Sequence, residues 1–303
     1  MLKHGSYGKD MKNRGGFEMK KAMTILIIMS LLIGMMPFAA LAGKGDVVSL
    51  GADLTAKQQE AMLQEFGVSR DEVNVINVSI KDVEQHLRGI ATADQIGTKA
   101  ISSAYVKLLP EGEGFQVDVH NVTWVTPEMY ANAMVTAGVE DADVKVAAPF
   151  NVTGTTALTG IMMAFEEATG EKLNSQAKEA ANEEILITGD VGQKIGKDEA
   201  AKLIRDVKEE IIRQDIKTPE DIRQVITEVS KELNIQLSEE QINQIMGLME
   251  KISKLDLDID DISKQLDKIS RNLEVIKDTI DENKGVFQKI LDSIMSWLRS
   301  IFG

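Results

Sequence analysis

The stretch 54-LTAKQQEAMLQEFGVSRDEVNV-75 has the same pattern as 125-VTPEMYANAMVTAGVEDADVKV-146: a threonine, eleven residues, Gly-Val, four residues and Val-x-Val. The threonine is typical of a helix N-cap, the glycine of the left-handed residue that ends a helix, and the valines of a strand. Each copy therefore predicts a helix followed by a strand. The matched residues, 71 positions apart, are Thr55 and Thr126, Gly67 and Gly138, Val68 and Val139, Val73 and Val144, and Val75 and Val146.

Further signals complete the unit. Gln58 has the spacing of a capping box with Thr55, and Pro127 occupies the first helical position of the second copy. We also expect strands at 47–50 and 117–119 before the copies, and second helices at 82–88 and 156–169 after them. Duplication explains the matches at one offset, and chance similarity of two capped helices is the alternative.

The first half of the chain therefore predicts a sheet covered by helices. The segment Glu111-Gly112-Glu113-Gly114 between the copies is typical of a hairpin turn. We predict an α+β domain over residues 43–170, a mixed-sheet sandwich whose internal strand-helix-strand repeat spans about 46–80 and 117–151.

Residues 171–303 carry almost no strand signal and predict a helical domain. Capping patterns occur at Thr218-Pro219 and at Ser238 with Gln241. An apolar heptad frame runs from Ile245 to Ile301, but Leu255-Asp256-Leu257-Asp258 and Asn283-Lys284-Gly285 interrupt it. We therefore predict a helical bundle or hairpin, with a homodimer through the C-terminal helices as the alternative.

A secretory signal peptide is predicted at residues 19–42. Two lysines follow Met19, an apolar stretch comes next, and Ala40-Leu41-Ala42 provides small residues before Gly43, so we place cleavage after Ala42. An uncleaved anchor is the alternative. We interpret residues 1–18 as untranslated leader, because codons for Arg14-Gly15-Gly16 can form a purine-rich ribosome-binding sequence before the Met19 codon.

The composition excludes several classes of function. Removing residues 1–42 leaves 28 Lys or Arg against 46 Asp or Glu, a net charge of −18. Such a surface repels nucleic acid, so we expect no nucleic-acid partner. The absence of cysteine excludes disulfides, thiolate metal sites and cysteine nucleophiles. We expect no cofactor and no metal.

The predicted mature chain contains only His86 and His120 as histidines. Asp118 and His120 share one face of a predicted strand, and a carboxylate beside an imidazole can orient a general base. No Gly-x-Ser-x-Gly turn supplies a nucleophile for this base. We therefore predict no catalytic site and retain a hydrolase using Asp118 and His120 as an alternative.

Three segments raise binding hypotheses that simpler structural explanations oppose. Asp256, Asp258 and Asp260 alternate as in a calcium loop, but Asp261 replaces the required glycine, and aspartates that open a helix explain the run. The loop Thr153-Gly154-Thr155-Thr156 could hold an anion or a partner, although a helix cap that packs on the sheet is favoured. The segment 189–196 is predicted to be a mobile loop.

The C-terminal segment predicts an amphipathic helix. Its apolar face is formed by Phe287, Ile290, Ile294, Trp297, Leu298 and Ile301. We expect this face to dock on the rest of the protein, with peripheral contact to a membrane or a partner as the alternative.

The sequence resembles an uncharacterised family of secreted proteins from Gram-positive bacteria, classified as a domain of unknown function. The resemblance rests on GDVVSLGADLTAKQ at 45–58, VTGTTALTGIMMAFEEATG at 152–170, and the later KTPEDIRQVI and LSEEQINQI segments. It covers the whole mature chain and implies no activity or catalytic residue.

These observations predict a secreted, non-catalytic interaction protein on the extracellular side of the cell envelope. Its expected partner is a protein or another envelope component. A membrane-surface module that acts through the C-terminal helix is a further alternative.

Overall fold

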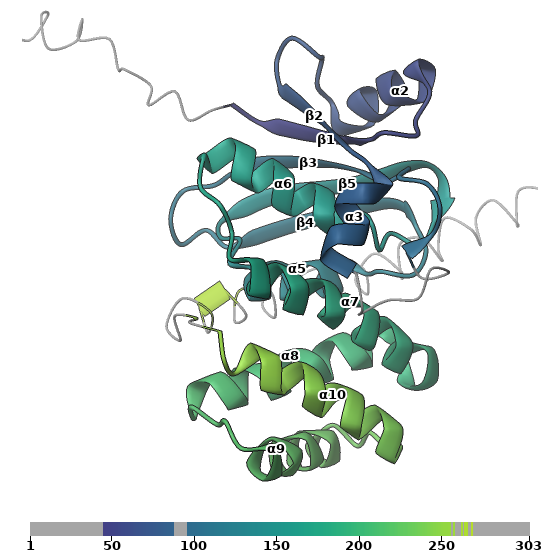
Figure 1. Cartoon of the computed structure of the whole chain (residues 1–303). Helices are drawn as coiled ribbons and strands as arrows, with labels where there is room; N and C mark the ends of the chain where they lie inside the picture. Colours follow the sequence, from purple (N-terminus) through teal and green to yellow (C-terminus); the bar gives the residue numbers. More distant parts are fainter. Residues whose placement is uncertain are drawn as a thin grey trace, which may run out of the picture. The chain divides into compact units, whose positions relative to one another are not determined.

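A computed structural model describes residues 45–87, 96–255, 257, 262, 264, 265 and 268. From Gly45 onward these residues belong to one compact unit. They form an α+β structure in which a five-stranded mixed sheet is followed by helices, as the sequence predicts (Figure 1).

The sheet has the strand order β2-β1-β3-β5-β4. Its strands are β1 (Val47–Gly51), β2 (Asn74–Val78), β3 (Ser103–Leu108), β4 (Phe115–Val122) and β5 (Ala142–Val152). The β1–β2 and β4–β5 pairs are parallel, whereas β3 is antiparallel to both β1 and β5. Four strands therefore run in one direction and only β3 opposes them.

The hairpin predicted around Glu111–Gly114 is wrong, because β5 lies between β3 and β4. Asp141 explains how the intervening turn is held. Its carboxylate accepts hydrogen bonds from the backbone N–H of Gly112 at 2.8 Å and of Gly114 at 2.5 Å, which ties the turn to the start of β5. The buried Val144 and Val146 of β5 pair with β3, in the position beside β3 that β4 would occupy in a hairpin.

Both copies of the repeated pattern form the predicted strand-helix-strand unit. The helices are α2 (Ala56–Phe66) and α5 (Pro127–Ala137). The Thr55 and Thr126 side chains cap them, and each helix ends at a left-handed glycine. Thr55 and Gln58 form a complete capping box.

The two helices nevertheless lie on opposite faces of the sheet. The core under α2 contains Leu63 of that helix together with Val48 and Tyr105 of the sheet. The core under α5 contains the β5 residues Val144 and Val146, which alternate with the residues that face α2. Both units step in the same direction across parallel strands, so their connections have opposite hands. One of them is therefore the left-handed form, which occurs in only about 2% of such connections.

Helices α3 (Ile80–Leu87) and α6 (Ala157–Thr169) match the predicted second helices. Figure 1 shows α6 lying along the sheet. Gly160 permits this close packing, since a Cβ there would lie 2.7 Å from Ser49 Oγ. Ala157 and Ala164 are buried on the same side.

The second half is a helical bundle. It contains α7 (Ser175–Ile195), α8 (Lys197–Arg213), α9 (Pro219–Glu232) and α10 (Glu239–Ile252). Ile245, Leu248 and Ile252, the first apolar positions of the heptad frame, are buried with residues of α8 and α9 of the same chain. Helix α10 ends just before the predicted break at residue 255.

The loop predicted at residues 189–196 is wrong, because α7 continues to Ile195. Gly189 lies inside this helix, where a Cβ would collide with the ring of Trp124. Gly192 lies under the start of α8, where a Cβ would be 3.1 Å from the Cα of Lys197. These glycines allow close packing and do not break the helix.

Candidate functional site

The structure pairs His120 with α2. Its Nδ1 atom lies 3.2 Å from Glu65 Oε1, and the two side chains are 57% and 40% exposed. Asp118 lies on the same sheet face, in register with Lys145. Neither Asp118 nor His120 lines any of the three cavities described below. Glu65 and His120 therefore form an exposed acid–imidazole pair outside these three cavities.

The predicted anion loop is packed against the protein. Tyr130 Oη donates a hydrogen bond to the Gly154 carbonyl at 2.6 Å, and a Cβ at Gly154 would collide with Val122. Thr155 is buried, and Thr156 occupies the N-cap position of α6 without a side-chain cap hydrogen bond. The loop therefore connects β5 to α6 with the close packing that the simpler explanation required.

Sequence reasoning missed a buried ion pair between α7 and α8. Lys208 Nζ donates to Glu184 Oε1 at 2.8 Å, to Thr136 Oγ1 at 2.9 Å and to the Asn132 carbonyl at 2.7 Å. Thr136 Oγ1 donates to the other Glu184 oxygen at 2.5 Å. The Lys208 and Glu184 side chains are 0% and 1% exposed. Burial raises the pKa of Glu184 and lowers that of Lys208, while their mutual attraction opposes both shifts.

A second buried ion pair, about one helical turn before Lys208, joins α8 to α5. Arg205 donates to Glu128 Oε1 at 2.6 Å, and both residues are buried. Asn132 Nδ2 donates to the Ala201 carbonyl at 3.0 Å. These contacts connect α5 under the sheet to α8 of the helical bundle. All three Lys208 donors are satisfied by protein groups, so this network fixes the two layers together.

A third cluster shapes the linker between α6 and α7. Glu166 Oε2 accepts from Lys172 at 2.7 Å, and its Oε1 accepts from Lys178 at 2.7 Å and from the backbone N–H of Leu173 at 3.1 Å. Although burial acts to raise the pKa of Glu166, the hydrogen bonds from Lys172 and Lys178 outweigh it and lower the pKa overall. Asn174 then caps α7. The linker is therefore held in one conformation.

This linker forms one wall of a cavity of about 540 Å³, which we call the junction cavity. Phe165, Leu173 and Leu257 contribute apolar side chains to it. Its charged residues are of both signs: Glu140, Glu171, Lys172 and Lys254. The volume lies within the range of about 300–1,000 Å³ that is typical of ligand sites.

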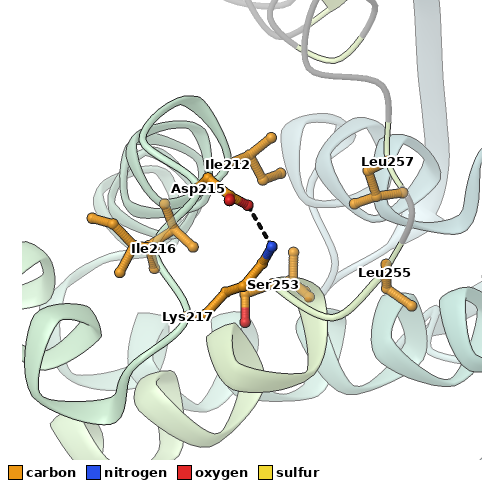
Figure 2. A pocket seen from close by; sticks show the side chains of 9 residues that line it. Ile212, Asp215, Ile216, Lys217, Ser253, Leu255 and Leu257 are labelled. Carbon is orange, nitrogen blue, oxygen red and sulfur yellow. Dashed lines mark ion pairs between the residues drawn. The ribbon is translucent and has the colours of Figure 1, made fainter.

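A smaller pocket of about 160 Å³ adjoins the junction cavity. We call it the aliphatic pocket after the isoleucines and leucines that line it, although polar atoms form most of its accessible surface. Figure 2 shows Ile212 and Ile216 on one side of it and Leu255 and Leu257 on the other. Lys217 forms an exposed ion pair with Asp215 at 2.7 Å. Leu255 and Leu257 line both cavities, so the two cavities adjoin.

The chain matches the model of a family described as a protein of unknown function (DUF1002) over residues 50–269. The chain belongs to this family. It is also similar to the uncharacterized protein YpuA of Bacillus subtilis (strain 168), with 37% identity over 291 residues that cover 94% of this chain and all of the relative. No solved structure matches it.

Both cavities lie within the part of the chain that the DUF1002 model matches. Within the described residues, no group of three or more His, Cys, Asp or Glu side chains could hold a metal ion, and no helix could span a membrane. Several predicted sites lie outside the described residues: Ala40, Ala42 and Gly43 at the cleavage point, Asp256, Asp258 and Asp260, and the face formed by Phe287, Ile290, Ile294, Trp297, Leu298 and Ile301.

Proposed function

We propose that this DUF1002 protein is a secreted, non-catalytic interaction protein of the cell envelope or extracellular space. The observation that carries the proposal is the pair of adjoining cavities that Leu255 and Leu257 both line. We propose that a polypeptide partner binds across them and places one apolar side chain in the aliphatic pocket.

The size and lining of the aliphatic pocket favour a side chain as its occupant. An engineered cavity of about 150 Å³ accepts benzene, so a pocket of this volume has room for one large side chain, which would pack on the isoleucines and leucines beside the ion pair of Asp215 and Lys217. Single apolar or aromatic residues that fill such pockets contribute much of the binding energy of an interface.

The junction cavity favours a polypeptide over a simple hydrocarbon. Lys172 and Lys254 offer donors, whereas Glu140 and Glu171 offer acceptors, above an apolar floor that includes Phe165. A peptide segment has both kinds of polar group beside its side chains. The linker held by Glu166 positions this wall before binding, which lowers the entropy lost on association.

Two further arguments support the location and the absence of catalysis. The predicted signal peptide directs the chain out of the cytoplasm. The buried ionisable groups Lys208, Glu184 and Arg205 are held by protein partners, and the exposed His120 pairs with Glu65 of α2. Neither set supplies a pocket in which a reacting group could be activated.

Fractionation of a culture that expresses the chain from Met19 tests the location. We expect the mature protein outside the cytoplasm, with Gly43 as its first residue by N-terminal sequencing. Recovery of the protein in the cytoplasm would contradict the proposal, and recovery in membranes with an intact signal would support the anchored form.

Site-specific photocrosslinking in the same cells tests the binding site. A photoreactive residue at Lys254, beside both cavities, should form one defined covalent adduct with a polypeptide. The matched control is Lys231, an exposed lysine of α9. Ser253→Trp, which fills the aliphatic pocket, should remove the adduct.

Equal crosslinking at both lysines would contradict the proposal, and adducts with lipid alone would favour the membrane-surface alternative. A hydrolytic activity of the wild-type protein that is lost in the His120→Ala variant would favour the hydrolase alternative.

A further inference from the structure

A third cavity, which we call the glutamine groove, lies between the end of α7 and the start of α10. Its volume is about 630 Å³, and it shares no lining residue with the two cavities discussed above. Four of its lining side chains are glutamines: Gln193, Gln236, Gln241 and Gln244. Neutral amides are therefore the most frequent side chains among its nine lining residues.

Neutral amides favour a particular kind of ligand. Each glutamine side chain offers one acceptor oxygen and two N–H donors. A ligand that matches such groups must carry several hydroxyl or amide groups of its own. Leu237 adds one aliphatic surface to the groove, against which the C–H face of a sugar ring can pack.

The orientation of Gln241 is fixed. Its Oε1 atom accepts a hydrogen bond from the Ser238 backbone N–H at 2.9 Å, as part of the capping box of α10. Its Nε2 atom is covered and has no hydrogen-bond partner among the residues that the structure describes. Because this atom is covered, a ligand in the groove does not reach it, and Gln241 forms a fixed part of the wall. The amides that a ligand can reach are those of the exposed Gln193 and Gln244.

The charges around the glutamines disfavour an anion. Asp190 and Glu240 line the groove against the single lysine Lys194. Glu239 precedes Glu240 in the first turn of α10. Because negative groups exceed positive ones, a phosphate or sulfate would meet repulsion from nearby carboxylates.

From these observations we propose that the glutamine groove binds a neutral oligosaccharide. Hydroxyl and acetamido groups of the sugar exchange hydrogen bonds with the exposed amides of Gln193 and Gln244, and Leu237 packs on a ring face. This site is additional to the polypeptide site proposed above. The groove is open to solvent, so binding should be weak, exchanging rapidly in solution.

Titration of the full mature chain with tri-N-acetylchitotriose tests this inference. We expect saturable shifts of the glutamine side-chain amide signals in nitrogen-15 NMR spectra. Gln193→Leu combined with Gln244→Leu should weaken binding at least about tenfold, equivalent to about 1.4 kcal/mol. Both residues are exposed, so the double variant should remain folded. The matched control Gln224→Leu, on the exposed face of α9, should bind like the wild type.

Three outcomes would overturn the inference. The first is the absence of a saturable shift in the wild type, and the second is equal weakening in the Gln224→Leu control. The third is tighter binding of a sulfated disaccharide of similar size, because the groove would then select charge. Ser253→Trp should leave sugar binding unchanged, so failure of the polypeptide site and failure of the sugar site can be distinguished.

Discussion

Helices α2 and α5 share one sequence pattern and one set of caps, but their surroundings differ. Only Met62, Leu63 and Phe66 of the eleven residues of α2 are buried, whereas ten of the eleven residues of α5 are buried. Helix α2 covers one face of the sheet beside solvent, and α5 lies between the other face and α7. The pattern therefore determines where a helix begins and ends, and the apolar content of its remaining positions determines where it packs.

The largest expected difference between the two helices is at Tyr130 of α5, which occupies the same position of the repeat as Gln59 of α2. Tyr130→Ala should lower the free energy of unfolding by about 3–5 kcal/mol, because it leaves a cavity and removes the donor to the Gly154 carbonyl. Gln59→Ala should change it by less than about 0.5 kcal/mol. Urea unfolding measures both. Similar losses in the two variants would show that the helices are equally embedded.

The next effect concerns the ion pair beneath α5. Lys208→Ala should cost about 3–5 kcal/mol, because Glu184 remains buried without its partner. The raised pKa of Glu184 permits protonation, which should keep the loss near the lower end of that range. The pair Glu65–His120 beside α2 is the matched control, since loss of an exposed pair costs about 0–1 kcal/mol. Lys208→Met combined with Glu184→Leu should recover stability, and failure to recover it would assign the loss to packing.

The caps should give equal and smaller effects, which sharpens the comparison. Thr55 accepts from the Gln58 N–H at 3.4 Å, and Thr126 accepts from the Met129 N–H at 3.3 Å. Thr55→Ala and Thr126→Ala should each cost about 1 kcal/mol, and replacement by Ser should restore most of it. A much larger loss at Thr126 would mean that its cap depends on the surrounding core.

The smallest expected effect is on the pH dependence of the free energy of unfolding, and it arises at His86 of α3, a helix that packs against α7. Burial lowers the pKa of His86, and Lys178 lowers it further, against Glu166, Glu179 and Asp82. As the pH falls below about 6.5, the imidazole of His86 is therefore protonated in the unfolded chain before it is protonated in the folded protein. The free energy of unfolding decreases in that pH range. His86→Gln should flatten that decrease in pH-dependent unfolding. The exposed Gln85→Leu should leave the slope unchanged, and an equal change would remove the assignment to His86.

The features predicted correctly are local ones. Thr55, Gly67, Thr126 and Gly138 act within one helical turn, so spacing alone reveals them. The hairpin prediction failed because strand order depends on pairing between segments distant in the sequence, and β5 occupies the place beside β3 that a hairpin would give to β4. The prediction of a loop at 189–196 failed because a glycine that permits close packing, such as Gly189 against Trp124, cannot be distinguished in the sequence from a glycine that ends a helix.

The site was harder to predict. Lys208 did carry one signal, since it lies four residues after Ile204 and three before Ile211, on the buried face of α8. Its partner Glu184 belongs to another helix, and no short-range pattern connects them. The two cavities depend on where Leu255 and Leu257 cross the bundle, which only tertiary packing determines.

The position of β5 between β3 and β4 has a consequence for how the chain folds. Strands β1, β2 and β3 can pair as soon as they have emerged, but β4 pairs only with β5 and has no partner until that later strand is complete. The open edge of β3 is therefore exposed during this interval, and unpaired edges promote aggregation.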